Sequence, residues 1–160
     1  MKALVVYDSV FGNTEKVAQA IGDSLGAKED VAVSRVTDVK LEQIDGLTLL
    51  LVGSPTRGFK PTKAIVEFLD RIPAGGLKGV RISAFDTRIS AEDVNSRFLK
   101  TLMRVFRYAA EPIARKLEKK GGTLTVPPEG FIVKDSEGPL KEGELKRAAG
   151  WAKSIMSTMR

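Results

Sequence analysis

The feature that most constrains the fold is a continuous apolar run near the start of the chain, which ends at a loop rich in glycine, asparagine and hydroxyl groups. Residues 3–7 read Ala-Leu-Val-Val-Tyr, a composition typical of a strand that helices cover on both faces of a parallel sheet. From Asn13 to Leu25 apolar residues recur at helical spacing, and Gly26 follows as a C-cap. The sequence therefore predicts a central strand, a polar loop at residues 8–14 and a helix.

The loop between this strand and this helix has the composition of a phosphate-binding site. The first turn of a helix carries backbone N–H groups without intrahelical acceptors, and the helix dipole makes that end positive. Ser9 and Thr14 add hydroxyl donors, and Gly12 permits a positive φ or a close backbone approach. The loop has neither the spaced glycines of the dinucleotide fingerprint nor the Gly-Lys-Ser/Thr of the nucleotide P-loop. The alternative is an ordinary strand-to-helix turn that Ser or Thr caps.

Two loops resemble the FMN-binding loops of flavodoxins. The motif Ser-x-x-Gly-Asn-Thr at residues 9–14 follows a first strand and resembles the flavodoxin loop that holds the FMN phosphate. A second apolar run, residues 47–52, ends in Gly-Ser-Pro-Thr-Arg-Gly-Phe at 53–59, which resembles the isoalloxazine loop of the flavodoxin superfamily and of its FMN-dependent quinone reductases. The resemblance implies that a backbone peptide at Gly58 changes orientation to bond the reduced flavin. A Pro/Gly surface turn is the alternative.

Further segments extend the pattern of alternating strands and helices. A strand at 80–85 ends in Asp-Thr-Arg at 86–88, and a short fifth strand is expected at 123–126. We interpret residues 127–133 as a sharp turn and an added edge strand, and residues 141–159 as the closing helix. With an edge strand expected at 31–36 as the second strand, three polar loops thus follow strands one, three and four.

The resemblance to flavodoxins spans nearly the whole chain and implies one α/β domain, residues 1–160. Its fold is a flavodoxin-like doubly wound, five-stranded parallel sheet of order 2-1-3-4-5 with helices on both faces. Ligands of such sheets lie at the carboxyl ends of the strands where strands 1 and 3 diverge, a rule for which flavodoxin is itself a standard example. The resemblance implies no catalytic side chain and no metal. It implies that FMN is bound by Ser9, Val10, Phe11, Gly12, Asn13, Thr14, Pro55, Thr56, Arg57, Gly58, Phe59, Phe85, Asp86, Thr87 and Arg88.

Four of these residues carry more specific expectations. Many flavodoxins stack a tyrosine from the third loop on the flavin, and this chain has none there. We expect Phe59 and Phe85 to supply partial stacking instead. Arg57 and Arg88 are expected beside the isoalloxazine, where a cation raises the potential of the second electron. The alternative is that these arginines face solvent or pair with nearby acids such as Asp86.

The positive charge is concentrated in one segment. The chain carries a net charge of +6, whereas flavodoxins are mostly acidic, and residues 97–120 hold eight basic and two acidic side chains. Apolar residues between 91 and 120 recur at helical spacing, and Pro112 predicts a kink or a second helix that starts near it. Lys100, Arg104 and Arg107 would then form a docking surface for an acidic partner. A solvated helix face is the alternative.

Composition narrows the function classes. The chain has no Cys and no His, which excludes disulfides, thiolate catalysis and the commonest metal ligand. It enters its first strand without a signal-peptide pattern, so we expect a cytoplasmic protein.

The leading function is an FMN electron carrier between redox partner proteins. One alternative is an FMN-dependent NAD(P)H:quinone reductase. Another is an interaction module whose basic segment 97–120 lies on a protein, an anionic membrane or nucleic acid; we expect no specific nucleic-acid recognition.

Overall fold

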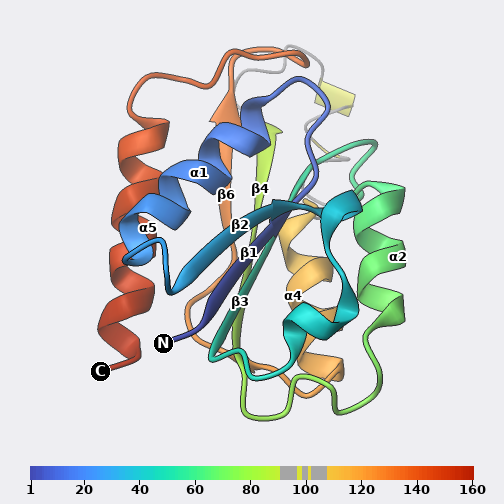
Figure 1. Ribbon diagram of the computed structural model, residues 1–160. Helices are drawn as coiled ribbons and strands as arrows, with labels where there is room; N and C mark the ends of the chain where they lie inside the picture. Colours follow the sequence, from blue (N-terminus) through green and yellow to red (C-terminus); the bar gives the residue numbers. More distant parts are fainter. Residues whose placement is uncertain (91–96, 99–100, 102–107) are drawn as a thin grey trace.

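The computed structural model describes residues 1–90, 97–98, 101 and 108–160. Parallel strands form one twisted sheet, and α-helices cover both of its faces (Figure 1). The strands are β1 (Ala3–Tyr7), β2 (Val31–Arg35), β3 (Leu49–Pro55), β4 (Arg81–Ile89), β5 (Thr123–Leu124) and β6 (Glu129–Val133). The helices are α1 (Asn13–Leu25), α2 (Lys63–Arg71), α4 (Ala110–Lys119) and α5 (Glu144–Thr158), with 3-10 turns η1 (Val36–Asp38) and η2 (Leu41–Ile44).

The order of the strands is β2-β1-β3-β4-β5, which confirms the predicted doubly wound order. The fifth position of the sheet is shared by two short strands, because β5 pairs with Arg81 and Ile82 at the start of β4 whereas β6 pairs with Phe85–Ile89 at its end. The expectation of an added edge strand at 127–133 is confirmed by β6, which pairs with β4 alone and continues the line of β5. Prolines 127 and 128 have no N–H to donate, so the ladder breaks there and resumes in the same position.

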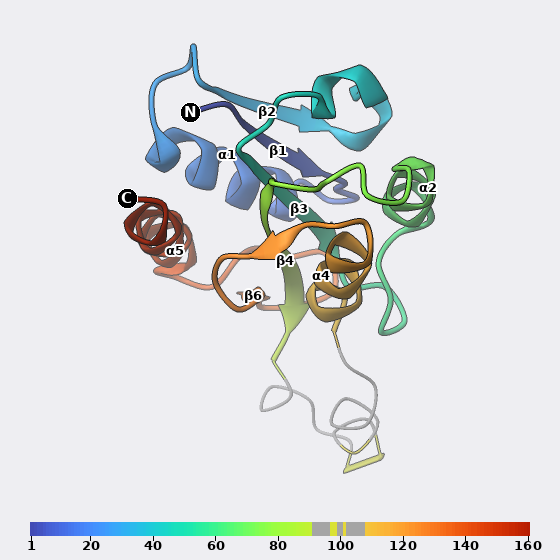
Figure 2. The ribbon, with the colours of Figure 1, turned by 90° about the horizontal axis from the view of Figure 1, so that it is seen from below.

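The continuous apolar run of β1 is buried on both faces, as its composition predicts. Ala3, Val5 and Tyr7 face a core that α1 and α5 cover, and Leu4 and Val6 face the core of α2 and α4. Figure 2, which looks along the sheet, shows the two helix pairs on opposite sides. The sheet thus has two separate apolar layers, and polar groups meet solvent at the strand ends.

An aromatic cluster fills the core between the sheet and α5. Phe85, Phe131 and Trp151 meet edge to face, with ring centroids 6.1–6.5 Å apart. Phe85 is fully buried, and its ring occupies the space that the missing side chain of Gly53 leaves on the neighbouring strand. The expected stacking of Phe85 on the flavin is therefore wrong, since strand alternation turns this side chain into the core.

The basic segment is described only in part. α4 begins at Ala110 with Pro112 in its first turn, which confirms that a helix starts near this proline. Lys100, Arg104 and Arg107 lie outside the described residues, so their docking role stays a prediction. Within the part of the chain that the structure describes, no helix has the length and hydropathy to cross a membrane.

Candidate functional site

A cleft of about 340 Å³ opens at the carboxyl ends of β1, β3 and β4, where the fold rule places a ligand. Its volume is in the range of pockets that hold small molecules. All three predicted loops contribute to its wall, together with the end of β6 and the segment that follows it. The lining residues are Ser9, Val10, Phe11, Asn13, Thr14, Pro55, Thr56, Arg57, Gly58, Thr87, Arg88, Ile89, Val133, Ser136 and Glu137.

The loop before α1 has the geometry of an anion site. Gly12 is the N-cap of α1 with a left-handed backbone (φ 91°), and no side chain caps the helix. The first-turn N–H groups of α1 are therefore left for an external acceptor. Ser9 Oγ accepts the N–H of Gly12 at 3.0 Å, so the hydroxyl hydrogen of Ser9 is free to donate to a ligand. These groups fit a phosphate without any cation in the loop.

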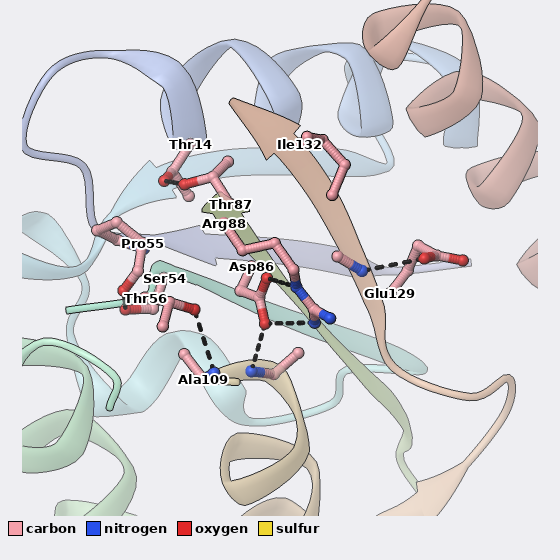
Figure 3. A network of polar contacts seen from close by, with 12 residues as sticks. Thr14, Ser54, Pro55, Thr56, Asp86, Thr87, Arg88, Ala109, Glu129 and Ile132 are labelled. Atoms are coloured by element: carbon pink, nitrogen blue, oxygen red, sulfur yellow. Dashed lines mark hydrogen bonds and ion pairs between the residues drawn. The ribbon is translucent and has the colours of Figure 1, made fainter. Parts of the chain in front are cut away.

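A buried pair of hydroxyls joins the first loop to the third. Thr14 Oγ1 and Thr87 Oγ1 lie 2.8 Å apart, and both residues line the cleft (Figure 3). Thr14 is 1% exposed and Thr87 is 5% exposed, so little of the pair meets solvent, and their contact links the two loops at the cleft wall. One hydroxyl donates to the other, which leaves one hydrogen for a ligand.

The second loop is a tight hairpin at the end of β3. The backbones of Arg57 and Lys60 exchange two hydrogen bonds of 2.8 and 3.0 Å around a two-residue turn. Both turn residues are left-handed, with φ 54° at Gly58 and 67° at Phe59, as in a type I′ turn. Gly58 lines the cleft, whereas the half-buried Phe59 is not among the lining residues. Expected stacking by Phe59 therefore gains no support.

This loop is also tied to the third loop and to α4. The N–H of Thr56 donates to the carbonyl of Thr87 at 2.9 Å, which continues the β3–β4 ladder to the cleft. Thr56 Oγ1 accepts the N–H of Ala109 at 3.2 Å (Figure 3). These two bonds thus fix the position of the hairpin relative to the end of β4 and to α4.

Asp86 lies beneath the cleft wall rather than on it. Its carboxylate is fully buried and accepts three hydrogen bonds, from Arg88 Nε at 2.7 Å, Arg88 Nη2 at 2.8 Å and the N–H of Ala110 at 2.9 Å. Figure 3 shows these bonds converging on one side chain. Burial raises the pKa of Asp86, and Arg88 and the Ala110 N–H act against that rise. Direct contact of the Asp86 carboxylate with a cofactor is therefore not supported.

The two arginines differ in how strongly they are held. The Arg88 guanidinium lies against the ring of Tyr108, with Cζ 3.8 Å from the ring centroid, and a side chain at Gly130 would collide with it. Arg88 is thus neutralised by Asp86, as the alternative interpretation had it. Arg57 is exposed, and its Cζ lies 5.8 Å from the centre of the Phe11 ring across the cleft mouth.

The fourth wall of the cleft was missed by sequence reasoning. Val133 is the last residue of β6, and Ser136 and Glu137 belong to the segment after it. The Asn13 amide donates to the carbonyl of Glu137 at 3.1 Å. Tyr108 beside Arg88 was missed as well. No local motif marks these residues. Their position depends on β6, which pairs with the end of β4 beyond the short strand β5.

Comparisons with known proteins agree with this geometry. The flavodoxin family profile matches residues 5–149. A flavodoxin of Maridesulfovibrio salexigens is 30% identical over 128 residues, which cover 77% of this chain and 80% of the relative.

Solved structures of flavodoxins share the fold. A flavodoxin from the domain Archaea is 26% identical with a TM-score of 0.76, and each chain is covered completely. Flavodoxin 1 of Bacillus cereus is 15% identical with a TM-score of 0.75 and 98% coverage of both chains. The matched range includes the loops of the cleft, whose uncapped helix end and hydroxyls fit the FMN phosphate. The chain belongs to the flavodoxin family of FMN-binding electron-transfer proteins.

Proposed function

We propose that the chain is a one-domain carrier that holds FMN in the cleft and passes electrons between redox partner proteins in the cytoplasm. The observation that carries the proposal is the uncapped N-terminus of α1, which opens into a cleft at the carboxyl ends of β1, β3 and β4. That end of a helix favours an anion, and FMN brings a phosphate.

The side chains have binding and positioning roles in this proposal. Ser9 and Thr14 donate to the phosphate, together with the first-turn N–H groups of α1. The hairpin at Gly58 and the third loop at Thr87 flank the ring, and Val10 with Pro55 supplies apolar surface. Bound FMN itself supplies the electron-transfer chemistry. The protein fixes its place and limits its contact with water.

The side chains of the cleft support a carrier more than an enzyme. Among the lining residues the titratable side chains are Arg57, Arg88 and Glu137. Arg88 is engaged by the buried carboxylate of Asp86, so it is poorly placed to act as a general acid. An NAD(P)H:quinone reductase, which the Pro-Thr-Arg loop also resembles, would show turnover with a quinone.

Four measurements on the purified protein test the proposal. A carrier should show a flavin absorption spectrum, release FMN on heating, and exchange electrons with a redox protein. Its steady-state NAD(P)H oxidation with a quinone should be negligible. Purified protein that takes up no FMN would contradict the proposal, and rapid quinone-dependent turnover would favour the reductase.

The partners we propose are redox proteins with acidic surfaces. Charge reversal of Lys100, Arg104 and Arg107 to Glu should slow electron transfer to such a partner at low salt and have little effect at high salt, since screening removes the steering. Rates that are equal at every ionic strength would contradict docking on these residues. Flotation with anionic vesicles tests peripheral membrane contact separately.

A further inference from the structure

An arginine on the edge strand β2 contacts the proposed phosphate-binding loop, residues 8–14, from outside the cleft. Arg35 is the last residue of β2 and lies opposite Tyr7 in the parallel register. Its Nη1 donates to the carbonyl of Ser9 at 2.9 Å and lies 3.4 Å from Asp8 Oδ1. Arg35 is not among the lining residues, so it acts on the loop and not on a ligand directly. From this geometry we infer that Arg35 is a positioning residue for the phosphate site.

The contacts of Arg35 continue into the loop. Asp8 Oδ1 accepts the N–H of Ser9 at 2.9 Å, so the peptide groups on both sides of Ser9 are fixed by the pair of Arg35 and Asp8. Ser9 Oγ in turn accepts the N–H of Gly12 at 3.0 Å. Movement of the Ser9 backbone would therefore shift both the hydroxyl donor and the N-cap of α1.

Arg35 also offsets negative charge beside the anion site. Asp8 is the first residue of the loop and Glu15 lies in the first turn of α1, where each carboxylate would repel a bound phosphate. The Arg35 guanidinium is 3.4 Å from the first and 3.6 Å from the second. Loss of Arg35 would leave both carboxylates without this cation next to an anion site. Arg35 therefore favours phosphate binding in two ways. It fixes the geometry of the loop, and its positive charge offsets the repulsion from Asp8 and Glu15.

The inference rests on the proposed FMN function and is tested by the ratio of FMN to riboflavin affinity, because riboflavin lacks the phosphate. Arg35→Gln should weaken FMN binding on the order of tenfold and leave riboflavin affinity nearly unchanged. Arg35→Lys, which keeps the charge, should retain part of the ratio. The double variant Arg35→Gln/Glu15→Gln should recover part of the loss, since one repelling carboxylate is removed.

A matched control is Arg81→Gln, which removes the same charge at an exposed position at the start of β4, the opposite end of the sheet. It should leave the ratio unchanged. A second readout needs no flavin: inorganic phosphate should raise the melting temperature of the apoprotein less in Arg35→Gln than in the wild type.

The outcomes separate the inference from the function. If Arg35→Gln lowers the melting temperature but leaves the affinity ratio and the phosphate effect as in the wild type, Arg35 is merely structural and the inference is overturned. If the wild type itself binds FMN and riboflavin equally well, the proposed function fails first.

Discussion

The buried ion pair under the cleft gives the sharpest prediction about stability. Arg88→Gln removes the guanidinium that donates to both oxygens of the fully buried Asp86 and leaves only the N–H of Ala110. An uncompensated buried carboxylate costs ~3–5 kcal/mol of unfolding free energy. For a domain of this size that loss corresponds to a drop in melting temperature of roughly 6–20 °C.

The loss should depend on pH with a defined sign. Burial raises the pKa of Asp86 in the folded protein, and without Arg88 the main group opposing that rise is gone. The folded variant then holds a proton that the unfolded chain releases, so its stability falls as the pH rises from the ordinary pKa of an aspartate through the raised one. The difference from the wild type should therefore be small near about pH 4 and large near pH 7.

Urea denaturation of the apoprotein followed by circular dichroism measures this difference at each pH. The double variant Asp86→Asn/Arg88→Gln, which lacks both charges, should be more stable at pH 7 than Arg88→Gln alone. A loss under ~1 kcal/mol that is equal at acid and neutral pH would refute the reasoning, because it would mean that the carboxylate is not buried as a charge.

Other predictions follow from single contacts. Thr14→Val leaves the buried Thr87 hydroxyl without its partner and should weaken FMN binding by about 1–3 kcal/mol in a fluorescence titration; an unchanged affinity would place the phosphate elsewhere. Gly130→Ala drives a methyl group into the Arg88 guanidinium and should cost about 1–3 kcal/mol in thermal melts, so a neutral effect would contradict the packing. Gly150→Ala is its matched control on α5, where a methyl meets open space, and should raise stability by about 0.5–1 kcal/mol.

Much of the fold was predictable because local patterns carry it. The apolar runs of β1 and β3 are buried on both faces, and each ends where a Gly-containing polar loop begins. The spacing of Asp86 and Arg88 is also informative, because residues two apart on a strand lie on the same face. The paired arginine was therefore the better of the two interpretations offered for Arg88.

What the sequence did not predict depends on contacts between distant residues. Phe85 shares its face of β4 with the polar residues Arg81 and Ser83, so alternation in the sequence does not mark that position as apolar core. The space for its ring comes from Gly53 on another strand. The contact of Arg35 with Ser9 follows from the register of β2 against β1. The contribution of Glu137 to the cleft wall depends on the pairing of β6 with the end of β4.

The most direct test of the central claim is titration of the wild-type apoprotein with FMN and with riboflavin under identical conditions. The claim is that the end of α1 and the hydroxyls of Ser9 and Thr14 bind the phosphate. The charge-assisted hydrogen bonds from these groups to the phosphate predict that FMN binds more tightly than riboflavin, by on the order of a hundredfold. Equal affinities for the two flavins would contradict the claim.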